Sequence, residues 1–144
     1  YTALNTLSLH DALPICLLRF SVGQSADGDS TNTIDCGVKA ANYGMADRNL
    51  YIVVTGKEGF AAGDTLDVVL QHSDEEAANF VTVAQTGAQP MGVGKQIAFP
   101  VPLVHKRYLR LKYTKTGTGG KVDAQMVDGL QMAITHPKNP KVWP

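Results

Sequence analysis

Two glycine-containing stretches have the residue types of nucleotide-binding loops. MGVGKQ, residues 91–96, ends like a phosphate-binding loop, in which backbone amides and a lysine hold the phosphate oxygens. That motif requires glycine where Gln89 stands and serine or threonine where Gln96 stands. GTGG, residues 117–120, lacks the third glycine of a dinucleotide-binding loop, because Val122 occupies its place. We therefore expect neither site, and we interpret GTGG as the link of a β-hairpin.

DGDSTN, residues 27–32, begins like a calcium-binding loop. An EF-hand needs glycine where Asn32 stands and a bidentate glutamate where Val38 stands. We interpret this stretch as a turn. The acidic run Asp74-Glu75-Glu76 could be a carboxylate cluster, but it lies between two apolar runs, and we interpret it as a solvated turn as well.

The remaining residues with catalytic or metal-binding chemistry are scattered. The sequence contains no GxSxG, HExxH or CxxC motif. Three histidines fall near the ends of different apolar runs, without the spacing of metal ligands: His72, His105 and His136. We expect no catalytic residue, no cofactor and no metal, and we expect that the protein is not an enzyme.

The two cysteines are too few for a disulfide framework. Cys36 lies in an apolar run, where a cysteine commonly serves as a small buried hydrophobic residue. We favour that reading over a disulfide between Cys16 and Cys36.

A basic stripe with an aromatic residue is the one candidate binding feature. In KRYLRLKY, residues 106–113, alternation puts Leu109, Leu111 and Tyr113 on the inward side of a strand. The outward side then carries Lys106, Tyr108, Arg110 and Lys112. Such a stripe is first of all a solvated strand face, but tyrosine and arginine are enriched at protein interfaces. We predict that these four residues contact a partner protein or a second copy of the chain.

These residues need a β-scaffold to position them. Short apolar runs recur between turn-forming segments, and most alternate with a period of two, which is typical of half-buried strands. In TLDVVLQHS, for example, Leu66, Val68 and Leu70 share one side. One-sided strands belong to antiparallel sheets. We expect about eight strands, at residues 17–22, 32–37, 50–56, 65–73, 80–87, 95–102, 107–117 and 121–135.

Two segments could also be helical. Residues 121–135 fit both a period of two and an i, i+4 stripe, and we favour a strand because Asp128-Gly129 is a turn or bulge signal. Residues 40–48 could form a short helix, although Gly44 weakens it. Many short strands with so little helix predict an all-β protein, a single jelly-roll-like antiparallel β-sandwich or barrel.

Composition limits the classes of function. The 144 residues carry 13 basic and 13 acidic side chains, so nothing favours nucleic-acid binding. No apolar run reaches the roughly 18 residues of a membrane span, and we expect no membrane partner. We divide the chain into residues 1–15, a domain at 16–135 and an extended proline-rich tail at 136–144.

The first 15 residues have a different origin from the domain. TLSLHDALPI, residues 6–15, resembles the in-frame translation of a common short-read sequencing adapter. We therefore expect residues 1–15 to be a non-native appendage, so that His10 and Asp11 are no catalytic pair. Deleting them should shift the melting temperature by only a few degrees.

Four segments stand in a recognisable order along the chain: LQHSD at 70–74, FVTVAQTG at 80–87, RYLRLKYT at 107–114 and GKVDA at 120–124. With these segments, the sequence from Leu17 to about Gln131 resembles the capsid cement, or decoration, proteins of tailed bacteriophages. This resemblance implies a jelly-roll-like domain that lies on the outside of the phage head as an oligomer, typically a homodimer. It also implies that the domain clamps neighbouring major capsid proteins, after synthesis in the cytoplasm of the bacterial host.

Two other classes of function stay open at this stage. A carbohydrate-binding jelly-roll module would need an exposed aromatic platform, and the single tryptophan, Trp143, lies in the proline-rich tail. A hydrolase would need a nucleophile with a neighbouring base, which no motif supplies. We expect a structural virion protein.

Overall fold

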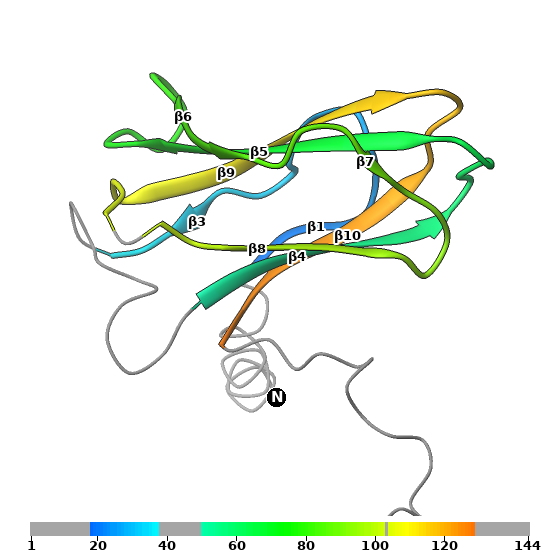
Figure 1. Ribbon diagram of the computed structural model, residues 1–144. Helices are drawn as coiled ribbons and strands as arrows, with labels where there is room; N and C mark the ends of the chain where they lie inside the picture. Colours follow the sequence, from blue (N-terminus) through cyan, green and yellow to red (C-terminus); the bar gives the residue numbers. More distant parts are fainter. Residues whose placement is uncertain (1–17, 38–49, 103, 129–144) are drawn as a thin grey trace, which may run out of the picture.

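The computed structural model describes residues 18–37, 50–102 and 104–128. The described chain is all-β, as the alternation predicted (Figure 1). Its ten strands are β1 (Arg19–Ser25), β2 (Gly28–Asp29), β3 (Ile34–Asp35), β4 (Leu50–Glu58), β5 (Thr65–Ser73), β6 (Val81–Gln85), β7 (Gln89–Pro90), β8 (Gln96–Pro100), β9 (Tyr108–Thr116) and β10 (Lys121–Asp128).

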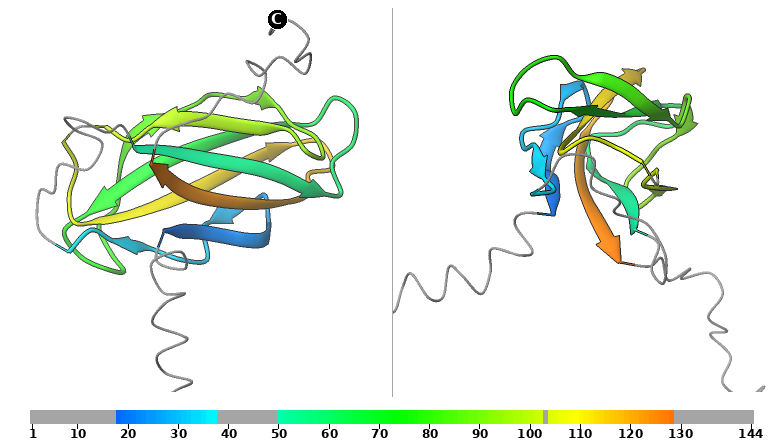
Figure 2. Two further views of the ribbon diagram at one scale, coloured as in Figure 1. Left: turned by 90° about the horizontal axis from the view of Figure 1, so that it is seen from below. Right: turned by 90° about the vertical axis from the view of Figure 1, so that its left-hand side faces the viewer.

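The strands form two antiparallel sheets that pack as a sandwich (Figures 1 and 2). Sheet A has the order β1-β10-β4-β8, and sheet B has the order β2-β9-β5-β6, with β3 also on β9 and β7 also on β5. If β2 with β3 and β6 with β7 are each counted as one interrupted strand, each sheet has four strand positions, and their order within the two sheets is that of a jelly roll. The predicted fold class is confirmed.

The core lies between the layers, where the inward side chains of both sheets meet. On β5 and β9 these are the residues that alternation assigned to the inside: Leu66, Val68, Leu70, Leu109, Leu111 and Tyr113, each at most 1% exposed. Sheet A contributes Phe20, Ile52, Val54, Val122, Ala124 and Met126. Burial of these large apolar side chains is the main stabilising term for a sandwich of this size.

One polar network is buried with the apolar core. The Tyr113 hydroxyl lies 2.7 Å from Ser21 Oγ, which donates to Gln24 Oε1 at 2.6 Å. Because the single Ser21 proton goes to Gln24, Tyr113 donates to Ser21. The chain thus satisfies a buried hydroxyl and joins β1 to β9 across the sandwich.

The sandwich is closed along the side where β1 faces β2 and β3. After β1 the chain crosses from sheet A to sheet B, and the amide of Asn32 donates to the carbonyl of Phe20 at 2.9 Å. The Asn32 side chain donates to the carbonyl of Arg19 at 3.2 Å. These bonds cover the outer edge of β1 with protein.

The predicted strands differ from the observed ones mainly at their ends. β1 runs to Ser25 rather than Val22, because its pairing with β10 shifts around Gly23, whose φ is +56°. The two-residue strand β2 lies in the stretch 27–32 that we interpreted as a turn, and β7 lies between the predicted strands 80–87 and 95–102. The strand predicted at residues 121–135 is found from Lys121 to Asp128, while its remainder and the candidate helix at 40–48 lie outside the described residues.

Cys36 is buried, as predicted, and this burial raises the pKa of its thiol to about 12.

Within residues 18–37, 50–102 and 104–128, no helix has the length and hydropathy needed to span a membrane.

Candidate interaction surface

The outward face of sheet B carries three of the four predicted contact residues. Tyr108, Arg110 and Lys112 alternate along β9 with buried core residues, so their side chains lie on the solvent side. Lys106 lies two residues before the strand begins. Alternation therefore placed the three strand residues correctly, and Lys106 belongs to the segment that leads into β9.

Arg110 is held by three groups at once. Its Nε donates to Gln71 Oε1 on β5 at 2.9 Å, and its Nη1 lies 3.4 Å from the Asp29 carboxylate on β2. The guanidinium carbon lies 4.1 Å from the ring centroid of Phe80, a cation–π contact. With a side chain only 25% exposed, Arg110 presents a fixed edge rather than a freely moving cation.

A second arginine, directly before β9, is held by a carboxylate and lies over an aromatic ring. Arg107 donates through Nε and Nη2 to the two carboxylate oxygens of Asp35, at 2.7 and 2.9 Å. Its guanidinium carbon lies 5.0 Å from the ring centroid of Tyr108. The hydrogen bonds from Arg107 and Gly37 lower the pKa of the Asp35 carboxyl to about 2, so this pair stays ionised at neutral pH.

Lys106 is fixed through its backbone as well as its side chain. Its amide donates to His72 Nδ1 at 3.1 Å, and its carbonyl lies 2.8 Å from His105 Nδ1. Its ammonium group lies 3.3 Å from the Asp74 carboxylate. Burial lowers the pKa of His72, and the positive charge of Lys106 lowers it further.

Lys112 is the most exposed of the four predicted residues and lies in register with Asp29 and Val69 on the neighbouring strands. Its place on the surface leaves its ammonium group open to solvent and to a partner.

Sequence reasoning missed the residues that hold these cations. Asp29 and Asp35 come from short strands far back in the chain, and Phe80 comes from the turn before β6. Phe80 follows the acidic turn at residues 74–76, and nothing in the local sequence indicated that the guanidinium of Arg110 would lie over its ring. We call Asp29, Asp35, Phe80, Arg107, Tyr108 and Arg110 together the arginine face.

The arginine face brings two arginines, two carboxylates and two aromatic rings together on one side of sheet B. Carboxylates lie beside both arginines, so the positive charges of Arg107 and Arg110 are offset within the face. It combines fixed arginines with aromatic rings, which are enriched where proteins bind one another. No group of three or more His, Cys, Asp or Glu that could hold a metal occurs in the described residues.

Comparison with known proteins places the chain in a family. The sequence profile of the Bbp16 family matches residues 20–126, which is more than half of the chain and runs from β1 into β10. The chain belongs to the Bbp16 family. The match covers both sheets and the whole arginine face. No curated protein matches the sequence.

Proposed function

We propose that this Bbp16-family domain is a structural protein of a tailed-phage virion. It binds the outer surface of the capsid and cements neighbouring major capsid protein subunits, and it performs no catalysis. The observation that carries the proposal is the arginine face, where Arg110 is fixed by Gln71, Asp29 and Phe80 before any partner arrives. The resemblance of residues 17–131 to capsid cement proteins supports the same function.

Fixed side chains favour this kind of binding. A surface arginine that must be ordered on binding loses roughly 0.5–1.5 kcal/mol of rotamer freedom, and one already ordered does not. A protein that binds only the assembled shell stabilises that shell by mass action. Many copies of a modest interface on one head therefore oppose the pressure of the packaged genome without a pocket or a cofactor.

Binding to phage heads tests the proposal. Heads of the parent phage, stripped of this protein, are mixed with the purified chain and sedimented, and the bound fraction is measured. We expect Arg110→Lys to weaken binding by about tenfold, because lysine keeps the charge but loses the planar stack on Phe80 and the fixed bond to Gln71.

Arg19→Lys is the matched control, because Arg19 lies on sheet A, away from the arginine face. It should bind as the unchanged chain does. Heads that fail to take up the unchanged chain would refute capsid binding, and equal binding by Arg110→Lys would remove the arginine face from the interface.

Self-association is part of the proposal. We propose that the protein acts as a homo-oligomer, with a dimer favoured, so that each unit can reach two capsid subunits. Sedimentation equilibrium over a range of concentrations would measure the mass, and a monomer at all concentrations would argue for capsid contacts made by single copies.

A carbohydrate-binding module is the alternative. Such modules stack sugar rings on bare aromatic faces, whereas Phe80 and Tyr108 each already have a guanidinium over one face. Trp143 lies outside the described residues. Specific binding on a glycan array would favour this alternative over capsid cementing.

A further inference from the structure

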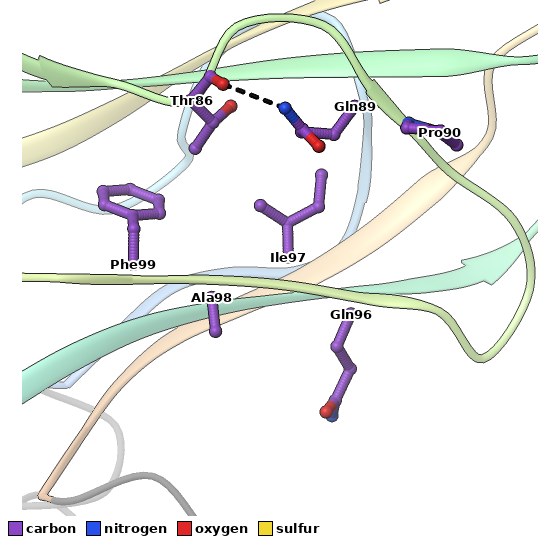
Figure 3. A pocket seen from close by; sticks show the side chains of 7 residues that line it. All are labelled: Thr86, Gln89, Pro90, Gln96, Ile97, Ala98 and Phe99. Atoms are coloured by element: carbon purple, nitrogen blue, oxygen red, sulfur yellow. Dashed lines mark hydrogen bonds between the residues drawn. The ribbon is translucent and has the colours of Figure 1, made fainter. Parts of the chain in front are cut away.

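The side of the sandwich opposite the closed one contains a groove. β8 forms one edge of sheet A, and β6 and β7 lie along the corresponding edge of sheet B. Between them is a cavity of about 430 Å³. Figure 3 shows the side chains of Ile97 and Phe99 pointing from β8 into this space, toward Thr86 and Gln89 on the other wall.

The groove carries no charged residue. Its lining is Thr86, Gln89, Pro90, Gln96, Ile97, Ala98 and Phe99. A charged side chain that entered it would lose hydration without gaining an ionic partner, so the groove favours apolar or small hydroxyl side chains. Its floor is apolar, because Ile97 belongs to the core cluster and Phe99 packs against it.

The hydrogen-bond register of β8 fixes which backbone groups face outward. Gly56 donates to the carbonyl of Lys95, and Val101 donates to the carbonyl of Leu50, so the odd-numbered residues of this stretch pair with β4. Gln96 and Ala98 therefore direct both N–H and C=O away from β4, and Pro100 directs its carbonyl the same way. The described residues place no further strand against this edge.

The other edges are less suited to pairing. Asn32 covers the edge of β1. The pairing of β6 with β5 shifts between Leu70 and Gln71, and β7 has only two residues. β8 pairs with β4 over five residues without a register shift. It is therefore the edge that presents a regular ladder beside an unfilled apolar groove.

We propose that β8 takes up an extended segment of a partner protein as a fifth strand of sheet A. Backbone groups of that segment would pair with Gln96, Ala98 and Pro100, while every second side chain would enter the groove beside Ile97 and Phe99. This mode of recognition takes affinity from main-chain bonds and specificity from the pockets for alternate side chains.

The occupant is a single extended segment rather than a second copy of this chain. A second copy pairing through its own β8 would bring its own β6 and β7 layer to the side of Thr86 and Gln89, whereas a lone segment brings nothing behind it. The identity of the partner rests on the proposed function, under which the segment is an uncharged extended arm of the capsid protein.

A peptide titration tests the edge without a capsid. The probe is a synthetic peptide of alternating threonine and valine, and the control has the same length with proline at its centre, which removes the central backbone donor. We expect NMR shift changes confined to β8 and the Thr86–Pro90 wall, with slower amide exchange at Gln96 and Ala98. No change at millimolar peptide, or changes elsewhere only, would overturn the proposal.

Variants on stripped heads test the edge in its proposed setting. Ala98→Pro removes one outward N–H, and Ala98→Val keeps it; we expect about tenfold weaker binding for proline alone. Should proline disturb folding, Gln89→Lys adds a charge to the groove wall, with Val93→Lys as its control, because Val93 is exposed just outside the lining. The first of these should weaken binding by a similar factor, and the second should not.

Different results would refute the proposed capsid function and the proposed edge site at β8. Peptide binding at β8 without uptake by heads would refute the capsid function and leave the edge site standing. Uptake by heads that neither Ala98→Pro nor Gln89→Lys weakens would refute the edge site and leave the capsid function standing. A dimer that Ala98→Pro dissociates would show that a second copy occupies the edge and would overturn the partner segment.

Discussion

At the scale of single residues, the hydroxyl of Tyr113 is a buried polar group that joins the two sheets through a hydrogen bond to Ser21. It lies in the core, is 1% exposed, and bonds only where β1 brings Ser21 across the sandwich. Burial raises the pKa of this phenol, so it is protonated and able to donate at neutral pH.

Replacing that hydroxyl should cost a measurable amount of stability. We expect Tyr113→Phe to lower the free energy of unfolding by about 1 kcal/mol, because one buried hydrogen bond is lost while Ser21 keeps Gln24 as a partner. Urea denaturation would measure the loss. Tyr108→Phe, on the solvent side of the same strand, is the control and should change stability little. Equal losses in both variants would contradict the assignment.

For the outward residues of β9, the sequence predicted which side of the strand they occupy but not which residues hold them in place. Alternation is a local property, so it placed Tyr108, Arg110 and Lys112 on one face without any knowledge of the fold. The carboxylates of Asp29 and Asp35, which hold Arg110 and Arg107, lie more than seventy residues away in the sequence, and only the pairing of β2 and β3 with β9 brings them near. The cations were therefore predictable, and their fixed positions were not.

At the scale of elements, close approach of two backbones decides which glycines are required. A Cβ on Gly56 of β4 would lie 2.2 Å from the carbonyl oxygen of Gly92, a backbone atom that cannot rotate away. Gly92 itself faces only the flexible side chain of Lys95, at 3.6 Å. The turn before β8 thus packs on β4 through Gly56.

This contact predicts different effects on stability for two similar substitutions. Gly56→Ala should lower the free energy of unfolding by about 2 kcal/mol or more, because the turn must move off the strand. Gly92→Ala should leave stability nearly unchanged, since its Cβ would make an ordinary contact. Thermal melting of both variants would measure these effects. An unchanged melting temperature for Gly56→Ala would mean that the turn before β8 can move away from β4 at little cost.

The segment that leads into β9 should respond to acid. His72 must be unprotonated at Nδ1 to accept the amide of Lys106, and His105, Asp74 and the Lys106 ammonium are the titratable groups around it. Its pKa is lowered in the folded protein, so the unfolded chain binds more protons. The stabilisation is therefore full above the ordinary pKa of 6.5 and is lost as the pH falls toward the folded-state pKa.

A variant without the titrating ring tests this pH dependence. His72→Asn offers a carbonyl oxygen near the position of Nδ1 and cannot be protonated in this range. Melting temperatures between pH 8 and pH 5 should fall less steeply for the variant than for the unchanged chain. Identical slopes would show that the loss of stability in acid comes from other groups.

Elements with strong alternation were predictable to within a residue or two, as β5 and β9 show. The short strands were not, because β2 and β7 consist of two residues each and owe their conformation to a partner strand rather than to their own pattern. A bulge such as that at Gly23 likewise depends on the neighbouring strand, here through the bond from the Gly23 amide to the Asp123 carboxylate at 2.6 Å.

At the scale of the whole molecule, the jelly-roll order joins segments that are far apart in the sequence. β1 pairs with β10, and β4 lies between β10 and β8. The sandwich class was predictable from many short strands with turn signals. The order within each sheet was not derivable from the pattern, because equal strands can be connected in several ways.

Such long-range pairing predicts slow folding. Loops must close before β1 meets β10, so we expect the main refolding phase in the range of milliseconds to seconds rather than microseconds, as in other β-sandwiches. Stopped-flow refolding from urea, followed by far-UV circular dichroism, would measure the rate. Refolding complete within the dead time of mixing would show that local contacts dominate instead.

The pairing of β1 with β10 also sets how the domain bears force. Arg19 lies opposite Gln125 in the antiparallel pair, so the start of β1 and the end of β10 lie at the same end of the sandwich. Tension applied to those two ends would open the strands one hydrogen bond at a time, as in a zipper, and would meet little resistance. Tension applied along β9 and β5 would instead load nine paired residues at once. We therefore expect the domain to yield at lower force when it is pulled at the start of β1 and the end of β10 than when it is pulled along β9 and β5.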